Sequence, residues 1–307
     1  MEPLPPLRPL LLRDRSLFES HLGKFNTPLS AYHLASHFIW RHTLHYSWTR
    51  KKDTLYLFAG YEGLIYMPIP PLGRLSAGTI GSAFAFMRKV NRNPAASRIE
   101  QVDPAQIFIF RKFGYDLQTG FMEYLYRRKD LAGLSGNRYK SQRADYNYFV
   151  KHTGSLRIDP FVSADREECL GLFDRWRAFR EARRSDPYYR SLMSDAREAH
   201  RLAMRHHTSL GLLGRVLRIG RRICGYTFGF PKGPETFCVL LEITDPLHKG
   251  LAAYLFREFC REMTAYPIIN TLDDSGLENL RRTKLAYHPW KIVTPYIVSE
   301  KKDKLPT

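Results

Sequence analysis

The distribution of apolar residues late in the chain predicts a strand followed by a helix. Residues 237–243 form a near-continuous apolar run rich in β-formers, which is typical of a strand buried on both faces. Asp245-Pro246 ends this strand, because proline cannot donate a hydrogen bond to the ladder. After Gly250, apolar residues recur at helical spacing, at Leu251, Tyr254, Leu255, Phe259 and Met263.

Two further elements follow this helix. The apolar pair at 268–269 indicates a short strand. Ser275 and Glu278 match the capping-box pattern that begins a helix, and apolar positions beyond them share one face up to Tyr287. The order over residues 240–296 is therefore strand, loop, helix, strand, helix, strand.

A charged side chain falls on the apolar face of the second helix. At roughly 100° per residue, Lys284 lies between Leu277 and Leu280 on the inward face. A lysine there has to snorkel, pair with a carboxylate or contact a ligand. Acidic residues at nearby strand ends are Glu242, Asp273 and Asp274. An internal ion pair and a ligand-binding role both remain open for Lys284.

The first half of the chain shows a similar alternation of strand and helix patterns. We expect strands at 45–48, 54–59, 64–69, 99–102 and 121–126, and helices at 29–40, 82–90 and 104–112. Residues 130–136 form the predicted junction between an N-terminal domain, 1–130, and a C-terminal domain, 131–307, which carries the candidate active site. An internal duplication is compatible with this alternation, although no sequence periodicity demonstrates it.

The order of elements around Gly250 resembles the second half of the GNAT acyltransferase fold. In that family the donor loop has Gln or Arg, two spacers, Gly, a spacer, and then Gly or Ala. Gly250 and Ala252 fit this pattern, whereas Leu247 replaces the Gln or Arg. The resemblance implies that Gly250 and Ala252 bind the acyl donor, and the departure at Leu247 weakens the case for coenzyme A.

A narrower resemblance starts at Leu280. The residues Leu280-Arg281-Arg282-Thr283-Lys284, with Tyr287 and Pro289, resemble the LR-x-x-K-x-x-(aromatic)-x-P signature of phosphatidylglycerol lysyltransferase C-terminal domains. Soluble members of that family resemble the chain in blocks at 32–41, 124–149, 213–230 and 270–289. The resemblance implies an α/β fold of two tandem GNAT-like acyltransferase domains, with central mixed β-sheets flanked by helices.

Members of this family also begin a helix with a basic cluster of the kind G-K-x-(aromatic)-H-K-K-R-N. Gly136, Tyr139 and Arg143 match this cluster, while Ser and Gln replace two of its basic positions. The resemblance implies that Tyr139 and Arg143 contact the substrate, and the replacements put a strictly shared acceptor in doubt. An ion pair of Arg143 with Asp145 or a buried acid is an equal alternative.

Charge adds a polyanionic partner to this picture. Lys plus Arg number 48 and Asp plus Glu number 30, which gives a net charge of +18. Residues 137–222 hold 19 basic and 10 acidic side chains, a net of +9. Most of these basic residues are arginines on the expected helices at 163–184 and 189–208, and arginine suits bidentate phosphate contacts. They favour tRNA, a phosphorylated cofactor or an anionic membrane surface, although a solvated basic surface is the alternative.

Several classes of protein are not expected. No run approaches the roughly 20 apolar residues that span a bilayer, and the first 12 residues lack the features of a signal peptide. We therefore expect a cytoplasmic protein without the membrane-spanning part of the lysyltransferases. The four cysteines form no C-x-x-C pair, and His33 and His37 lack the Glu of H-E-x-x-H, so no metal or disulfide is expected.

Transfer of the GNAT type proceeds by direct attack of an acceptor on an activated acyl group. The enzyme positions both groups, removes a proton and stabilises the oxyanion. We assign Glu242 or Asp273 to binding the acceptor or an α-amino group, and Lys284 to stabilising developing charge or holding a phosphate, with Arg143 in a similar role. The full set of candidate substrate contacts is Tyr139, Arg143, Asn270, Asp274, Arg281 and Tyr287.

Three functions remain open at this point. The first, by resemblance, is transfer of an aminoacyl group from aminoacyl-tRNA to a lipid or small-molecule acceptor. The second is an acyl-coenzyme A dependent N-acyltransferase, and the third is a non-catalytic basic module that binds nucleic acid or another anion. We expect no permanently bound cofactor, with aminoacyl-tRNA or acyl-coenzyme A as co-substrate, and a possible peripheral contact with an anionic membrane.

Overall fold

The chain forms two compact units. The computed structural model describes residues 3–182 and 187–301. Unit 1 combines the residues up to Glu123 with those from Val293 onward, and unit 2 is Tyr124–Ile292. The chain therefore passes from one unit to the other twice. The domain boundary expected at residue 130 stays a prediction.

Unit 1 contains two small sheets. Its strands are β1 (Arg8–Pro9), β2 (His45–Lys51), β3 (Thr54–Tyr61), β4 (Leu64–Tyr66), β5 (Arg98–Val102), β6 (Tyr115–Thr119) and β14 (Tyr296–Glu300). Its helices are α1 (Arg15–Leu22), α2 (Ala35–Phe38), α3 (Ala77–Val90) and α4 (Ile107–Lys112). The orders are β1-β2-β3-β4 and β5-β14-β6. A parallel bridge between Met67 and Ile99 joins the two sheets.

The core of unit 1 is apolar and lies between α3 and the strands. Ile80, Phe84 and Met87 of α3 are fully buried, and they belong to one cluster with Phe58 and Val298. Because these side chains come from elements at both ends of the chain, the C-terminal strand β14 is part of the hydrophobic core of unit 1.

Unit 2 is built on one seven-stranded sheet. Its strands are β7 (Glu123–Arg127), β8 (Leu156–Pro160), β9 (Leu213–Ile219), β10 (Arg222–Lys232), β11 (Thr236–Thr244), β12 (Ile268–Asn270) and β13 (Lys291–Val293). Its helices are α5 (Arg128–Gly133), α6 (Lys140–His152), α7 (Arg166–Glu181), α8 (Pro187–His206), α9 (Leu251–Glu262) and α10 (Glu278–Ala286). The strand order is β13-β7-β12-β11-β10-β9-β8, with a parallel pairing between β11 and β12.

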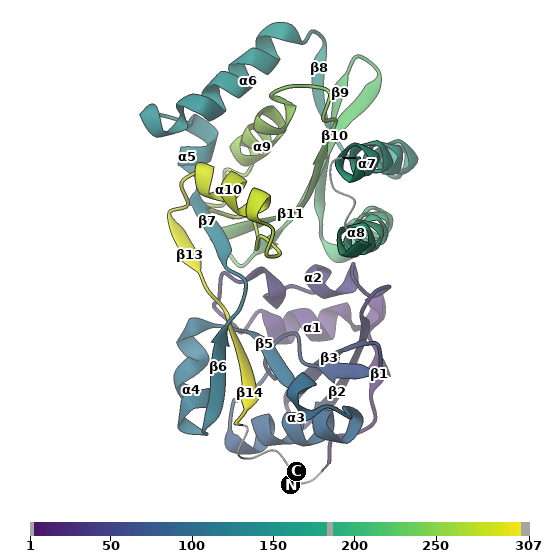
Figure 1. Cartoon of the computed structure of the whole chain (residues 1–307), viewed down its shortest axis with the longest axis vertical. Helices are drawn as coiled ribbons and strands as arrows, with labels where there is room; N and C mark the ends of the chain where they lie inside the picture. Colours follow the sequence, from purple (N-terminus) through teal and green to yellow (C-terminus); the bar gives the residue numbers. More distant parts are fainter. Residues whose placement is uncertain (1–2, 183–186, 302–307) are drawn as a thin grey trace. The chain divides into compact units, whose positions relative to one another are not determined.

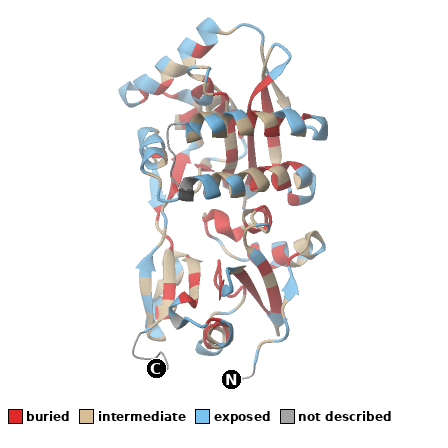
Figure 2. Cartoon of the chain, turned by 45° about the vertical axis from the view of Figure 1, so that its right-hand side comes forward, coloured by how far each residue is buried: buried red, intermediate tan, exposed pale blue. Residues whose placement is uncertain are grey.

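Helices cover both faces of this sheet. α7 and α8 lie on one face, and α9 with α6 lies on the other (Figure 1). The strands of the sheet are largely buried, whereas the helices turn exposed residues outward (Figure 2). β10 and β11 are therefore covered by helices on both sides, which explains their near-continuous apolar sequences.

The two units share one strand pattern. Each has four strands in antiparallel order, then a parallel junction, and then three more strands. β14, the last described strand, lies between β5 and β6 of unit 1. β7, which follows β6 in the chain, lies between β12 and β13 of unit 2. The units thus exchange one strand each, and the shared order is what an internal duplication would produce.

The elements predicted between 240 and 296 are confirmed in their order, but several helix starts were wrong. The helix expected at 29–40 is α2, which begins at Ala35, and the helix expected at 104–112 is α4, which begins at Ile107. α3 begins at Ala77 and not at 82, because Ser76 caps it: its hydroxyl accepts from Thr79 N at 3.2 Å. The capping box expected at Ser275 is absent, since α10 begins at Glu278 with Leu277 at its N-cap. Ser275 has φ +50°, in the left-handed region, whereas an N-cap residue typically has extended backbone angles.

Some elements carried no clear sequence signal. β6 and β8 were not predicted, and the segment expected as a junction at 130–136 is partly helical in α5. The helix expected at 163–184 corresponds to α7, and its expected end at 184 lies outside the described residues. Short strands that are polar on one side do not produce a long apolar run, which is why pattern alone missed them.

Candidate active site

The candidate site of unit 2 centres on a carboxyl group in β11. Glu242 lies opposite Thr227 of the neighbouring strand β10. Glu242 Oε2 and Thr227 Oγ1 are both buried without a hydrogen-bond partner. Burial raises the pKa of Glu242 to about 8. At neutral pH the carboxyl group is therefore mostly protonated, and it can exchange a proton near physiological pH.

Tyr287, predicted as a substrate contact, lies near this carboxyl group. Burial raises the pKa of the Tyr287 phenol, and the charge of Glu242 is the next largest cause. The ring packs edge-on against Phe256 of α9, with 5.1 Å between ring centroids. The structure thus brings Glu242 of β11 near Tyr287, the residue just after α10.

Two more orphaned polar atoms belong to the start of α6. The Tyr139 side chain is 1% exposed, yet its hydroxyl has no hydrogen-bond partner. Gln142 donates from Nε2 to the Ala286 carbonyl at 2.7 Å, while its Oε1 is unpaired. Tyr126 lies near both Tyr139 and Tyr287. Burial raises the pKa of its phenol, and the nearby Tyr287 and Tyr139 phenols raise it further.

Unit 2 therefore holds four of the orphaned atoms found among the described residues, and the others are Gln101 Oε1 and Glu300 Oε2 of unit 1. A buried polar atom without a partner costs about 1–3 kcal/mol, so such atoms are few in native proteins. Here a carboxyl group, a phenol, a primary amide and an alcohol are all incompletely bonded. The set can both donate and accept hydrogen bonds, and it is suited to a small polar group with a positive charge or a hydroxyl.

Lys284 lies beside this region, at the carboxyl end of β12. Its side chain faces inward as predicted, and the residue is 9% exposed. The ammonium group donates to the Thr271 carbonyl and, at 3.2 Å, to the Leu272 carbonyl, and it lies 5.7 Å from the centre of the Tyr124 ring. Tyr126 donates to the Lys284 carbonyl at 2.8 Å. Lys284 therefore ties α10 to the loop after β12.

The acidic residues of that loop also stabilise it. Tyr124 donates to Asp274 Oδ2 at 2.5 Å, and burial together with this hydrogen bond raises the pKa of Tyr124 to about 12. Asp273 accepts from Ser275 N at 2.7 Å, and Asn270 Oδ1 accepts from Leu272 N at 2.7 Å. These are the bonds of tight turns.

The two arginines of the predicted site lie in different settings. Arg281 is exposed on α10. Arg143 donates to the carbonyls of Leu134 and Gly136, at the end of α5, rather than to Asp145. Arg257 donates to the Ala132 carbonyl at 2.9 Å, so arginines from two helices cap the same helix end. The structure does not bring Arg143 to Glu242.

The predicted donor loop has a packing constraint that the sequence did not reveal. Gly250 has φ +83°, and a Cβ on it would overlap the carbonyl oxygen of Asp145 in α6. No side chain caps the N-terminus of α9, and Ala252 in its first turn is exposed. Glycine is therefore needed here for close approach of α6, and the backbone N–H groups of α9 are not bound by a cap.

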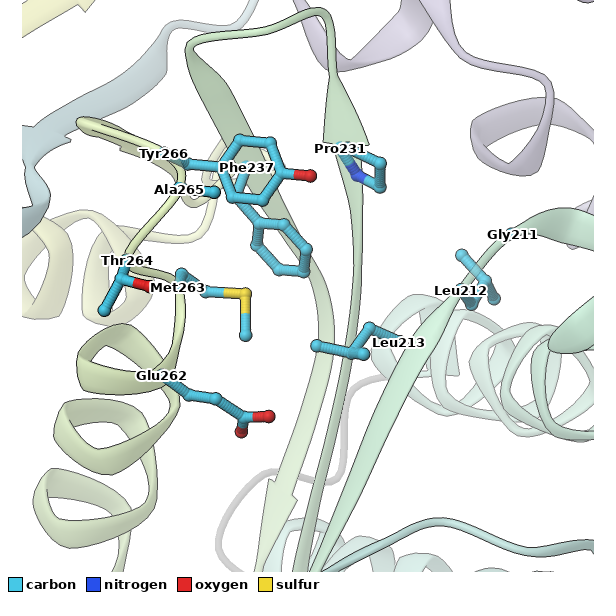
Figure 3. Close-up of a pocket in the computed structure, with 10 residues that line it drawn as sticks. All are labelled: Gly211, Leu212, Leu213, Pro231, Phe237, Glu262, Met263, Thr264, Ala265 and Tyr266. Atoms are coloured by element: carbon cyan, nitrogen blue, oxygen red, sulfur yellow. The ribbon is translucent and has the colours of Figure 1, made fainter.

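Unit 2 also contains a cavity of about 390 Å³ away from these residues. Figure 3 shows Phe237, Tyr266 and Met263 on one side of it, with Leu213 facing them and Glu262 at its edge. Phe237 is near the start of β11 and Glu242 is near its end, roughly 17 Å apart at 3.4 Å per residue. The cavity is thus separate from the predicted site, and its residues were not selected by the sequence analysis.

Some of the arginines on α7 and α8 pair with acidic side chains. Arg197 pairs with Asp174 through two hydrogen bonds of 2.7 and 2.9 Å, and Arg201 pairs with Glu198. Arg177 lies 3.9 Å from Glu181. These pairs reduce the number of guanidinium groups available for phosphate. In unit 1, His37 is a core histidine: its Nε2 lies 2.7 Å from the Ala31 carbonyl, and burial lowers its pKa to about 4.

The strand order, the parallel junction and the helix that follows β11 define a protein of the tandem GNAT-like class. The model of the family described as phosphatidylglycerol lysyltransferase, C-terminal, matches residues 25–299, and the chain belongs to this family. A search of curated proteins found no match to this chain. The long helix α8 and the other described helices do not reach the length and apolarity needed to cross a membrane.

Solved structures support the same fold. A conserved protein of unknown function from Bacteroides thetaiotaomicron is 23% identical, with a TM-score of 0.86 over 96% of this chain and 99% of that chain. L-PGS from Bacillus licheniformis is 17% identical, with a TM-score of 0.65 over 95% and 93%. FemX is 7% identical, with a TM-score of 0.59 over 97% and 98%. At these identities the likeness establishes the fold alone.

Proposed function

We propose that this protein transfers an aminoacyl group from aminoacyl-tRNA to a hydroxyl or amine acceptor, either a lipid or a small molecule, at the Glu242 site of unit 2. The observation that carries the proposal is the buried Glu242 carboxyl group, which has an unpaired oxygen and a pKa raised to about 8. Membership of a family described by a lysyltransferase supports the choice of an aminoacyl group.

In the proposed reaction the acceptor oxygen or nitrogen attacks the ester carbonyl of the aminoacyl-tRNA. Glu242 in its ionised form takes the proton from the acceptor, a new ester or amide bond forms, and the ester bond to the tRNA breaks. The proton then passes to the departing 3′-terminal hydroxyl of the tRNA, so that atoms and charge balance. A base with a pKa near the working pH suits this task, because it can both accept and return a proton.

The other predicted residues have supporting roles in this proposal. Tyr287 lies near the Glu242 carboxyl group, and the Tyr139 hydroxyl has no hydrogen-bond partner. In this proposal both orient the acceptor or the α-amino group. Lys284 would stabilise developing charge near the end of β12, in addition to its bonds to the loop. Asp273 remains the alternative to Glu242 for binding the amino group.

The acyl-coenzyme A alternative rests on Gly250 and Ala252. The uncapped N-terminus of α9 favours binding of an anion there. However, the side of Gly250 that a Cβ would occupy is filled by the Asp145 carbonyl, so the glycine is already explained by packing. This weighs toward the aminoacyl donor. The third alternative, a basic binding module, is weakened by the paired arginines of α7 and α8.

A binding competition on purified protein at near-physiological salt tests the donor. Charged tRNA, uncharged tRNA and acetyl-coenzyme A are titrated separately. Preference for charged over uncharged tRNA would support the aminoacyl donor, because both present the same phosphate backbone. Tight coenzyme A binding with equal affinity for both tRNAs would instead support the N-acyltransferase. Salt-sensitive RNA binding without turnover of any acyl donor would leave the binding module.

The role of Glu242 is tested by the pH dependence of transfer. We expect kcat/KM to rise with pH up to about 8 as the carboxyl group ionises. Glu242→Gln should lower kcat by roughly 100-fold or more and abolish this rise. Asp273→Asn is the comparison, because Asp273 is the alternative assignment. Loss of activity in Asp273→Asn with normal activity in Glu242→Gln would reverse the assignment.

A further inference from the structure

A second group of reactive side chains lies where β10 is irregular. The pairing of β9 with β10 shifts register between Ile223 and Gly225, so Cys224 sits in a β-bulge. The Asp245 N–H donates to the Cys224 carbonyl at 2.8 Å, and the His248 N–H donates to the Asp245 carbonyl at 3.2 Å. These backbone bonds hold the loop between β11 and α9 against the bulge.

The side chains of Cys224, Asp245 and His248 converge at this point. A sulfur atom, a carboxylate oxygen and an imidazole nitrogen from these residues all lie within 4.8 Å of one another. Cys224 is 1% exposed and Asp245 is 4% exposed, while His248 is partly buried. Within residues 3–182 and 187–301, this is the single group of three such residues with that spacing.

The buried carboxylate is only weakly compensated by its neighbours. Asp245 Oδ1 accepts from Leu247 N at 3.0 Å, and Oδ2 lies 3.4 Å from an Arg222 nitrogen. The Arg222 side chain is 56% exposed, so its guanidinium is largely hydrated. A carboxylate oxygen has two lone pairs, and each oxygen of Asp245 therefore retains acceptor capacity after these contacts.

We propose that Cys224, Asp245 and His248 bind a zinc ion through one sulfur, one oxygen and one nitrogen. Zinc prefers this mixture of donors at about 2.0–2.3 Å, which places donors bound to one ion roughly 3.5 Å apart. The donors here need to approach by about 1 Å, which small side-chain rotations provide because the backbone is already fixed. Binding converts the Cys224 thiol to a thiolate, and the released proton goes to solvent.

Three protein ligands leave one position of a tetrahedral zinc ion for water or a substrate atom. The ion would connect the bulge of β10 to the loop that ends at Gly250, and so fix the start of α9. The same three residue types can also form a thiol nucleophile with a histidine base. That arrangement is less favoured, because the Cys224 thiol lies 3.7 Å from the Arg222 carbonyl, to which it donates.

Sequence spacing did not reveal this group. Cys224 is separated from Asp245 and His248 by a whole strand, and the sequence contains no C-x-x-C or H-E-x-x-H motif. The register shift in β10 places the cysteine beside the loop, and a register shift is a property of the folded sheet.

Cobalt(II) titration of the chelator-treated, full-length protein tests the proposal. We expect one equivalent of cobalt to bind, with a thiolate-to-cobalt charge-transfer band that zinc abolishes by displacement. Cys224→Ala should lose this band, and His248→Ala should lower the affinity at least 100-fold, beyond the roughly 10–100-fold typical of losing an outer-shell partner. Zinc should raise Tm in the wild type but not in Cys224→Ala.

Cys238→Ala is the matched control, because Cys238 is equally buried in the adjacent strand β11. It should keep the charge-transfer band and the zinc-dependent Tm. The proposal is overturned if the wild type shows no thiolate band with one equivalent of cobalt. It is also overturned if the band persists in Cys224→Ala or is lost in Cys238→Ala. These readouts do not require transferase activity, so they are independent of the proposed function.

Discussion

Units 1 and 2 have the same strand order but treat buried polar groups differently. The core of unit 1 around α3 is apolar, and its buried carboxylate, Glu123, accepts hydrogen bonds from Ser30. Unit 2 buries Asp165, Asp245, Asp274 and Lys284, and it holds the orphaned oxygen of Glu242. In unit 1, Gln101 Oε1 and Glu300 Oε2 are buried without a partner as well. Among the described residues, unit 2 thus buries more charged side chains than unit 1 on the same strand order. We propose that this difference reflects chemistry carried out in unit 2.

The helices that follow β4 in unit 1 and β11 in unit 2 differ in how they begin. In unit 1, α3 starts at a serine cap that occupies its N-terminal N–H groups. In unit 2, α9 starts at a glycine without a cap, and α6 packs against that glycine. The N-terminus of α9 therefore lacks a side-chain cap, although the Leu251 N–H donates to the His248 carbonyl at 3.2 Å.

The largest effect is expected for Gly250→Ala. The new Cβ would overlap the Asp145 carbonyl, and alanine would have to adopt φ +83°. We expect a loss of roughly 4 kcal/mol in the free energy of unfolding, from strain and overpacking together. Urea-induced unfolding measures it.

Gly63→Ala in unit 1 is the matched control for this change. Gly63 has φ +79°, but no atom lies within 4 Å of its would-be Cβ. It should therefore lose about 1 kcal/mol from backbone strain alone. Equal losses in the two variants would contradict the close approach of α6 to the loop.

The second largest effect concerns Glu242. Its folded pKa of about 8 exceeds the value of 4.5 for an unperturbed glutamate. Between these values the native state binds more protons than the unfolded state, so this group lowers the free energy of unfolding as pH rises from about 4.5 to 8, and no further above that. Glu242→Gln should thus gain roughly 4 kcal/mol relative to the wild type between pH 5 and pH 9.

Glu123→Gln provides the contrast in unit 1. The Glu123 carboxylate accepts from the Ser30 hydroxyl at 2.6 Å and from Ser30 N at 3.0 Å. Replacing it should cost about 1–2 kcal/mol, because an amide has one acceptor oxygen and adds donors that need partners. If the stability difference between Glu242→Gln and the wild type were the same at every pH, folding would not raise the pKa of Glu242.

These two glutamates show how far the sequence could be interpreted. Periodicity correctly predicted β11 and α9, and it placed Lys284 inward, because apolar runs and helical spacing determine which face is buried. It could not indicate that Glu242 Oε2 lacks a hydrogen-bond partner while the Glu123 carboxylate accepts from the N–H and the hydroxyl of Ser30. Hydrogen bonding between residues distant in sequence depends on strand register, which periodicity does not contain.

The strand exchange was also beyond reach of the sequence. β7 and β14 are five-residue strands with ordinary patterns, and either could pair in either unit. Helix starts depended on competing local signals: Ser76 caps α3, whereas Ser275 adopts a left-handed turn with Gly276. The orphaned hydroxyl of Tyr139 matched a family signature, and that resemblance was the signal that selected this residue.

A smaller effect is expected for Lys284→Met. The ammonium group donates to backbone carbonyls of the loop after β12, and methionine preserves most of the side-chain volume. We expect a loss of roughly 2 kcal/mol, typical of hydrogen bonds to a charged group. Lys129→Met on exposed α5 should stay within about 0.5 kcal/mol. A Lys284→Met variant as stable as Lys129→Met would mean that these loop contacts contribute nothing to folding.

The smallest effect tests the cap of α3. Ser76 accepts from Thr79 N at 3.2 Å, and Thr79 Oγ1 accepts from Ser76 N at 2.9 Å. Ser76→Ala should cost about 1 kcal/mol, whereas Ser76→Gly should cost only a few tenths, because glycine leaves the N-terminal N–H groups open to water. Urea unfolding at one pH, followed in both variants, provides the measurement.

The glycine variant reproduces in unit 1 the uncapped start that α9 has in unit 2. If Ser76→Gly lost as much stability as Ser76→Ala, an uncapped glycine start would be destabilising, and the same would apply to α9. Its lack of a cap would then have to be offset by the packing of α6 against Gly250.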